Sequence, residues 1–80
     1  MMTAKTAKEH AKIARERYIR NTIIETIDEG YDSIIFEEKR FFDDIENLKP
    51  ELEKLGYKII RRNRKNGLGT EYEVIEVSWE

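Results

Sequence analysis

Apolar residues recur at helical spacing through the first third of the chain. Over residues 3–29 they fall three and four positions apart, and Gly30, a residue type that commonly ends helices, follows. We therefore expect one long helix over 3–29 that begins at Thr3 or Thr6. Its first half carries only alanine at the spaced positions, and the large residues Ile19, Ile23, Ile24 and Ile27 come later. The isoleucine-rich half is expected to pack on the core, and the alanine-rich half to overhang it.

The middle of the chain predicts a short strand and two short helices. Residues 33–38 combine β-branched and aromatic side chains, which favours a strand, although a helix over 33–48 competes at similar spacing. Residues 41–55 are helical in pattern but contain Pro50, which fits only a first helical turn. We expect one helix to end near Asn47 or Leu48 and a second to run from Pro50 to Gly56.

The last third alternates as a β-hairpin over residues 57–62 and 71–79. Asn66-Gly67 is a preferred pair for a tight turn. That turn would place Ile59 opposite Val74, Arg61 opposite Tyr72 and Arg62 opposite Glu71. A longer loop through Gly69 would shift the register by two residues.

These elements predict a single α+β domain over residues 1–80, ordered α-β-α-α-β-β, with a three-stranded antiparallel sheet. A helix of about 26 residues spans roughly 39 Å. A compact domain of this length is only about 30 Å across. Residues 1–20 are therefore expected to include an overhanging helix, and residues 21–80 to form the compact body.

The residue inventory argues against an enzyme. The 80 residues contain one histidine, His10, and no cysteine, and neither serine lies in a nucleophile motif. No phosphate-binding glycine loop and no calcium-loop spacing is present, so we expect no catalytic residues, no cofactor and no metal site. The lack of a long apolar run or signal pattern indicates no membrane partner and a cytoplasmic location.

Charge is partitioned along the chain, although the net charge is only -2. Residues 1–20 carry six bases against two acids, and residues 21–56 carry eleven acids against four bases. The acidic middle is either the solvent face of two helices or a surface for a basic protein. Two basic groups are candidate anion-binding or nucleic-acid-binding sites. They are the basic stripe, Lys5, Lys8, Lys12 and Arg15, and the basic hairpin cluster, Arg61, Arg62, Arg64 and Lys65.

A seam of small residues is the candidate interface for a partner or for a second copy of the chain. This alanine seam follows heptad spacing, and small side chains allow close approach of another helix. The alternative is that it packs on the protein's own sheet. The seam consists of Ala4, Ala7, Ala11, Ala14 and Tyr18.

Two resemblances bear on function. The order of elements resembles that of winged-helix domains, with residues 63–69 as the wing. That resemblance implies DNA binding, but its recognition helix over 50–55 would be short and would carry Glu51 and Glu53. In its charged first helix, the stretch 52–59 leading into a hairpin and the Val-Ser-Trp ending at 77–79, the chain resembles small proteins of bacteriophages that infect low-GC bacteria.

The phage resemblance implies a non-enzymatic protein that binds a host macromolecule, mainly through protein–protein contacts, in the host cytoplasm. A nucleic-acid binder that uses the basic stripe and the basic hairpin cluster is the alternative. A third hypothesis is an oligomer that holds an anionic nucleotide between subunits. We also expect the chain to form a homo-oligomer, with a homodimer through the alanine seam as its simplest form.

Overall fold

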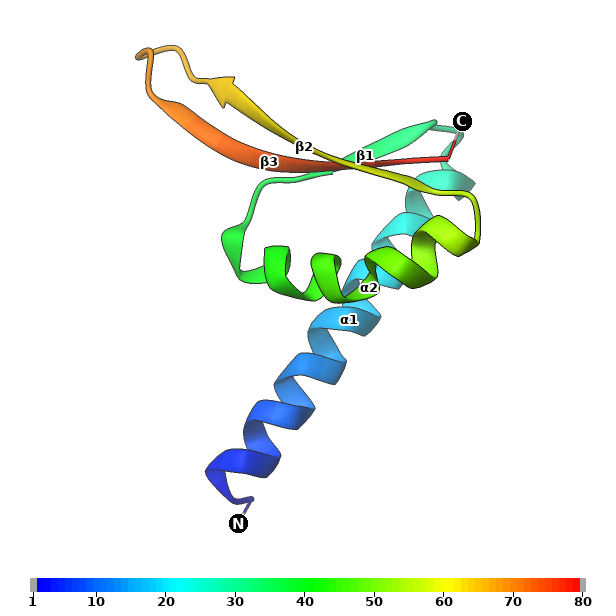
Figure 1. The fold of residues 1–80 in the computed structure, drawn as a ribbon, viewed down its shortest axis with the longest axis vertical. Coiled ribbons are helices and arrows are strands. Elements are labelled where there is room, and N and C mark those ends of the chain that lie inside the picture. The colour runs from blue at the N-terminus through cyan, green and yellow to red at the C-terminus, as the bar shows by residue number, and fades with distance from the viewer. Residues whose placement is uncertain (1, 80) are drawn as a thin grey trace.

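The computed structural model describes residues 2–79 and has the α+β architecture expected from the sequence. Its elements are α1 (Ala4–Asp28), β1 (Ser33–Phe36), the 3-10 turn η1 (Lys39–Phe41), α2 (Phe42–Lys54), β2 (Lys58–Lys65) and β3 (Glu71–Ser78). The three strands form one antiparallel sheet, and both helices lie on the same side of it (Figure 1). The predicted fold class, the order of elements and the sheet are confirmed.

The ends of α1 follow from its capping residues. The side-chain oxygen of Thr3 accepts a hydrogen bond from the backbone N–H of Thr6 at 3.2 Å, so the helix begins at the first of the two candidate caps. At the other end, Gly30 has a φ of 90° and donates its N–H to the carbonyl of Ile27. A side chain would be strained in that left-handed conformation, which explains why glycine ends this helix.

The second helical region divides at a different residue from the one predicted. Two consecutive helical segments are present, but they meet at Phe41 and Phe42, where η1 passes into α2. The expected break at Pro50 is wrong, because α2 continues through this residue to Lys54. Packing explains the difference, since Leu48 and Leu52 on either side of Pro50 are both buried against the core.

The sheet has the strand order β1-β3-β2, so β3 is the central strand. The strand predicted over 33–38 is present but ends at Phe36. The predicted hairpin register is wrong by three residues: Ile59 lies opposite Val77, Arg61 opposite Ile75 and Arg62 opposite Val74. This register places Ile75 and Val77, both fully buried, on the same face as Ile59, which faces the helices.

The loop between β2 and β3 explains the register. Its five residues run from Asn66 to Thr70, rather than forming a two-residue turn at Asn66-Gly67. The side-chain oxygen of Asn66 accepts hydrogen bonds from the N–H groups of Leu68 and Thr70 at 2.9 and 3.0 Å. Gly69 takes the left-handed conformation, with a φ of 80°. Asn66 therefore organises a longer loop with its side chain, as asparagine commonly does in turns.

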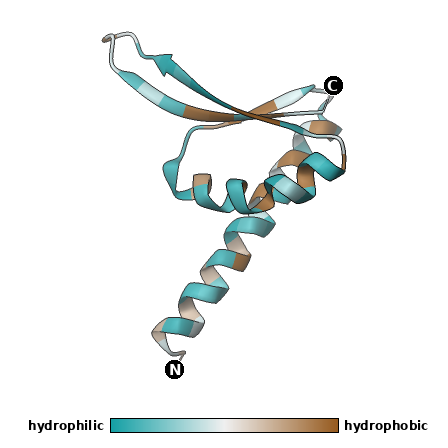
Figure 2. Cartoon of the chain, viewed as in Figure 1, coloured by the Kyte–Doolittle hydropathy of each residue, from teal (hydrophilic) through white to brown (hydrophobic). Residues whose placement is uncertain are grey.

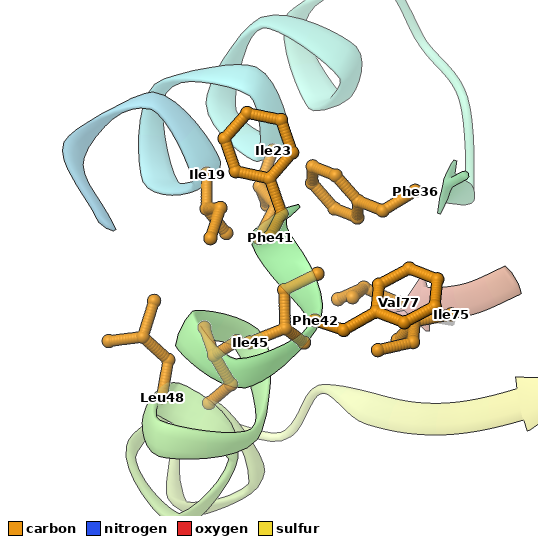
Figure 3. Close-up of a cluster of buried hydrophobic side chains, with 10 residues drawn as sticks. Ile19, Ile23, Phe36, Phe41, Phe42, Ile45, Leu48, Ile75 and Val77 are labelled. Atoms are coloured by element: carbon orange, nitrogen blue, oxygen red, sulfur yellow. The ribbon is translucent and has the colours of Figure 1, made fainter. Parts of the chain in front are cut away.

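The core lies between the sheet and the two helices. Figure 3 shows Ile19 and Ile23 from α1 facing the aromatic residues Phe36 and Phe41, with Ile45 below them on α2. Ile19 and Ile45 have no exposed surface, and they hold the two helices together. Only part of the second half of α1 joins this core, because Ile24 is 54% exposed and Ile27 is 38% exposed. The isoleucine-rich half does pack on the core, as expected, through Ile19 and Ile23.

The first half of α1 extends away from the body. Residues 4–14, here called the arm, are exposed except for the half-buried Thr6. Figure 1 shows the arm running clear of α2 and the sheet, and the molecule measures 43 Å along its longest axis. Figure 2 shows strongly apolar residues on the second half of α1, while the arm is mostly polar with pale alanine positions. The arm therefore does not pack on the hydrophobic core of the body.

Candidate functional site

The alanine seam lies open along the arm. Ala4, Ala7, Ala11 and Ala14 are all exposed, so the seam does not pack on the protein's own sheet. Tyr18 marks its end at the body, where its ring stacks on Phe41 with centroids 4.9 Å apart and remains 51% exposed. The seam thus runs from the tip of the arm to an aromatic pair at the surface of the core.

The basic stripe is split between internal ion pairs and open charge. Arg15 donates from Nε to Oδ2 of Asp44 at 2.6 Å, which ties α1 to the first turn of α2. This hydrogen bond raises the pKa of the Arg15 guanidinium, which therefore stays charged at any ordinary pH. Lys12 lies 4.0 Å from Glu16 on the same helix. Lys5 and Lys8 have no ion-pair partner within residues 2–79, so the open charge of the stripe lies toward its N-terminal end.

The basic hairpin cluster is largely neutralised by the protein itself. Arg61 contacts Glu46 at 3.0 Å and Glu73 at 2.8 Å, and its guanidinium lies 5.7 Å from the ring centre of Phe42. Arg62 lies 3.3 Å from Glu76. Lys65 lies 4.0 Å from Glu71, and only Arg64 has no ion-pair partner among the described residues. The cross-strand partners differ from the predicted ones because the register is shifted.

The two basic groups approach each other at α2, where Arg15 contacts Asp44 and Arg61 contacts Glu46, but their outer ends diverge. Figure 1 places the N-terminus of α1 and the β2–β3 loop toward opposite ends of the longest axis, with the segment from β1 to η1 between them. That segment carries Glu37 and Glu38 together with Lys39 and Arg40, and Arg40 pairs with Glu38 at 2.7 Å. It therefore adds no net charge between the two basic groups.

An apolar surface on the body was not predicted from the sequence. Between α1 and α2 lies a groove of about 260 Å³, lined by Arg20, Ile23, Ile24, Glu51, Leu52, Leu55 and Tyr57. Leu55 on its edge is 70% exposed, and Arg20 and Glu51 form an ion pair at 2.9 Å across it. The helical spacing does indicate this surface, because Ile24 lies about 100° around the helix from Ile23 and so faces a different direction. The isoleucine-rich half of α1 was treated as one core-facing group, so the exposed position of Ile24 was not predicted.

The single histidine of the chain lies apart from the core. His10 is exposed on the arm. Within residues 2–79 no cluster of three or more histidine, aspartate or glutamate side chains is placed to hold a metal ion. Over the same range, no helix has the length and apolar character required to cross a bilayer.

No protein-family model, curated protein or solved structure matches this chain.

Proposed function

We propose that this protein is a non-enzymatic binding protein of the bacteriophage type, which acts on a macromolecule of the host cytoplasm through protein–protein contacts made by its arm. The observation that carries the proposal is the exposure of the arm, which projects from the body with its alanine seam uncovered. An isolated helix of this length is marginal in water. A partner that covers the arm would supply the tertiary contacts that the body does not.

The charges around the alanine seam indicate the kind of partner. At 3.6 residues per turn, Lys8 and Arg15 border one side of the seam, and His10 and Arg17 border the other. The two acids of this region, Glu9 and Glu16, lie on the opposite side of the helix. A protein groove that is apolar at its floor and acidic at its rim complements this arrangement.

Nucleic acid fits the arm less well than an acidic protein does. Lys5, Lys8 and Arg64 are open to phosphates, but Arg15 and Arg61 are held by carboxylates of the same chain. A helix that reads base edges also needs amide or guanidinium side chains on its inward face, where this arm has alanine. An anionic nucleotide is disfavoured in the cleft of about 370 Å³ between α1 and β1. Its lining carries Glu37 and Glu38, and the nearby Arg40 is paired with Glu38 at 2.7 Å.

The test is retention of a defined partner from nuclease-treated lysate of a low-GC bacterial host. The wild-type chain is expected to retain one protein, and Ala7→Glu combined with Ala11→Glu is expected to abolish its retention. Both positions are exposed and away from the core, so the variant should keep the wild-type thermal stability. The matched control, Leu68→Glu, adds an acid at a residue that is 91% exposed on the hairpin loop, and should leave retention unchanged.

Direct binding to a random DNA duplex would contradict the proposal. A nucleic-acid binder would bind at low salt and lose affinity steeply between about 50 and 200 mM salt. Such a slope, reduced in Lys5→Ala with Lys8→Ala, would replace the proposal with its nucleic-acid alternative. Partner retention that survives the two glutamates on the arm would also overturn it.

A further inference from the structure

One side of α1 and the adjoining end of α2 form an exposed apolar face. Its large side chains are Ile24, Ile27 and Leu55, which are 54%, 38% and 70% exposed. The groove of about 260 Å³ between α1 and α2 opens onto this face beside Ile24. A contiguous group of half-exposed aliphatic side chains on so small a protein is typical of an interface. The alanine seam lies elsewhere on the helix, about 120° from Ile24.

The charges along this face reverse sign from one end to the other. On this face Arg17 precedes Ile24 and Asp28 follows it, whereas Glu25 and Glu29 lie around the helix toward the side of the alanine seam. Arg20 also precedes Ile24, but it is paired with Glu51 of the same chain. No base occurs within residues 21–29. Arg17 and Asp28 both lack an ion-pair partner within the described part of the chain. Two copies of such a helix complement each other only when they run in opposite directions.

We infer that this apolar face is a homodimer interface in which the α1 helices of two copies pack antiparallel. A two-fold axis near residues 21–24 places Arg17 of each copy opposite Asp28 of the other. It also brings Ile24 of each copy toward the groove between α1 and α2 of the other. Apolar contact at the centre is then flanked by opposite charges at both ends, and the antiparallel helix dipoles add a favourable term.

The alanine seam is a poorer surface for self-association than the sequence suggested. It is bordered by Lys8 and Arg15 on one side and by His10 and Arg17 on the other. Whichever direction a second copy ran, its seam would bring positive charges against positive charges. Pairing through the Ile24 face leaves both seams free, so the inference deepens the proposed function by giving each dimer two arms. It does not depend on what the arms bind.

Sedimentation velocity over a wide range of protein concentration tests the inference. The wild-type chain is expected to pass from monomer to dimer. Ile24→Glu is expected to weaken the dimer by roughly 100-fold or more, because the two-fold axis places the change in both copies at the interface centre. Leu55→Lys gives a second disruption from the other helix. Both positions are exposed, so unchanged thermal unfolding shows that the fold is intact.

Charge reversal tests the antiparallel direction. Arg17→Glu and Asp28→Arg should each weaken the dimer, and the two changes together should restore it, because the double variant re-forms the pair with its sign reversed. Ala7→Glu with Ala11→Glu should leave the dimer intact. The inference is overturned by a wild-type chain that stays monomeric, by a dimer that persists in Ile24→Glu, or by a dimer lost on changing the seam. Because Ile24→Glu and Leu55→Lys leave the alanine seam unchanged, the partner-retention test can fail or succeed independently of them.

Discussion

Asp44 is the one charged side chain buried in residues 2–79, being 3% exposed. It lies in the first turn of α2, where the helix dipole favours a negative charge, and it accepts a hydrogen bond from Arg15. Because Arg15 stands just beyond the arm, this contact fixes the point at which α1 leaves the body. From the sequence, Arg15 was predicted to contribute to an anion-binding stripe. Its contact with Asp44 was not predicted, because nothing in their separation of 29 positions marks the two residues as partners.

Replacing Asp44 with alanine should lower the midpoint of thermal unfolding clearly. The substitution removes the hydrogen-bonded ion pair with Arg15 and the interaction of this carboxylate with the helix dipole. The matched control is Asp43→Ala, which removes an exposed carboxylate from the same helical turn and loses its interaction with the helix dipole and its longer-range attraction to Arg15, but no hydrogen bond to Arg15. Equal shifts for the two variants, measured by circular dichroism, would show that the Arg15 contact contributes nothing to stability.

The elements show where sequence patterns suffice and where they do not. The length of α1, its glycine stop, the strand at 33–36 and the α+β class all follow from periodicity and capping, which are local signals. The hairpin register depended on the side chain of Asn66, and the Asn-Gly pair predicted a shorter turn. The apolar spacing of Ile45, Leu48 and Leu52 did indicate a helix that continues through Pro50, but the prediction gave more weight to proline as a helix breaker than to the burial of Leu52. The residues of each candidate site were predicted together from the sequence, but the ion pairs that they form could be identified only from the three-dimensional arrangement.

Pro50 lies in the interior of α2, so its replacement is expected to stabilise the protein. Proline removes the N–H that would bond to the carbonyl of Glu46, and it crowds that carbonyl. Pro50→Ala should raise the free energy of unfolding by about 1–3 kcal/mol, after allowance for the more flexible unfolded chain. Asn47→Ala, an exposed change in the same helix, is the control for helix propensity and should give a few tenths of a kcal/mol. A loss of stability in chemical denaturation of Pro50→Ala would show that the ring itself supports the packing.

At the scale of the whole molecule, the protein is a small core with two projections. The arm extends from one end, and the outer part of the β2–β3 hairpin extends beyond β1, which pairs only with residues 75–78 of β3. Both projections are mostly hydrophilic, as Figure 2 shows, although Ile13 on the arm and Leu68 on the hairpin loop are exposed apolar residues, and α2 covers neither projection. Stability therefore comes from the body, whereas the alanine seam that we propose as a binding surface lies mainly on the arm.

Amide hydrogen exchange should separate these parts. Amides of residues 8–14 are expected to exchange much faster than those of residues 19–26, although one unbroken helix contains both. The arm can open by fraying, whereas the second half of α1 opens only when the core does. Dimerisation through Ile24 would increase the contrast. Equal protection along α1 would mean that the arm is covered in solution.

The central position of β3 has a consequence for synthesis of the protein on the ribosome. Both β1 and β2 precede β3 in the chain, and each pairs with β3 and not with the other. No part of the sheet can therefore form until residues 71–78 have been translated. Until then Phe36 and the inner side of α2 have no sheet to cover them, and only α1 can shield them. A nascent chain that stops before β3 would expose this apolar surface to chaperones and proteases.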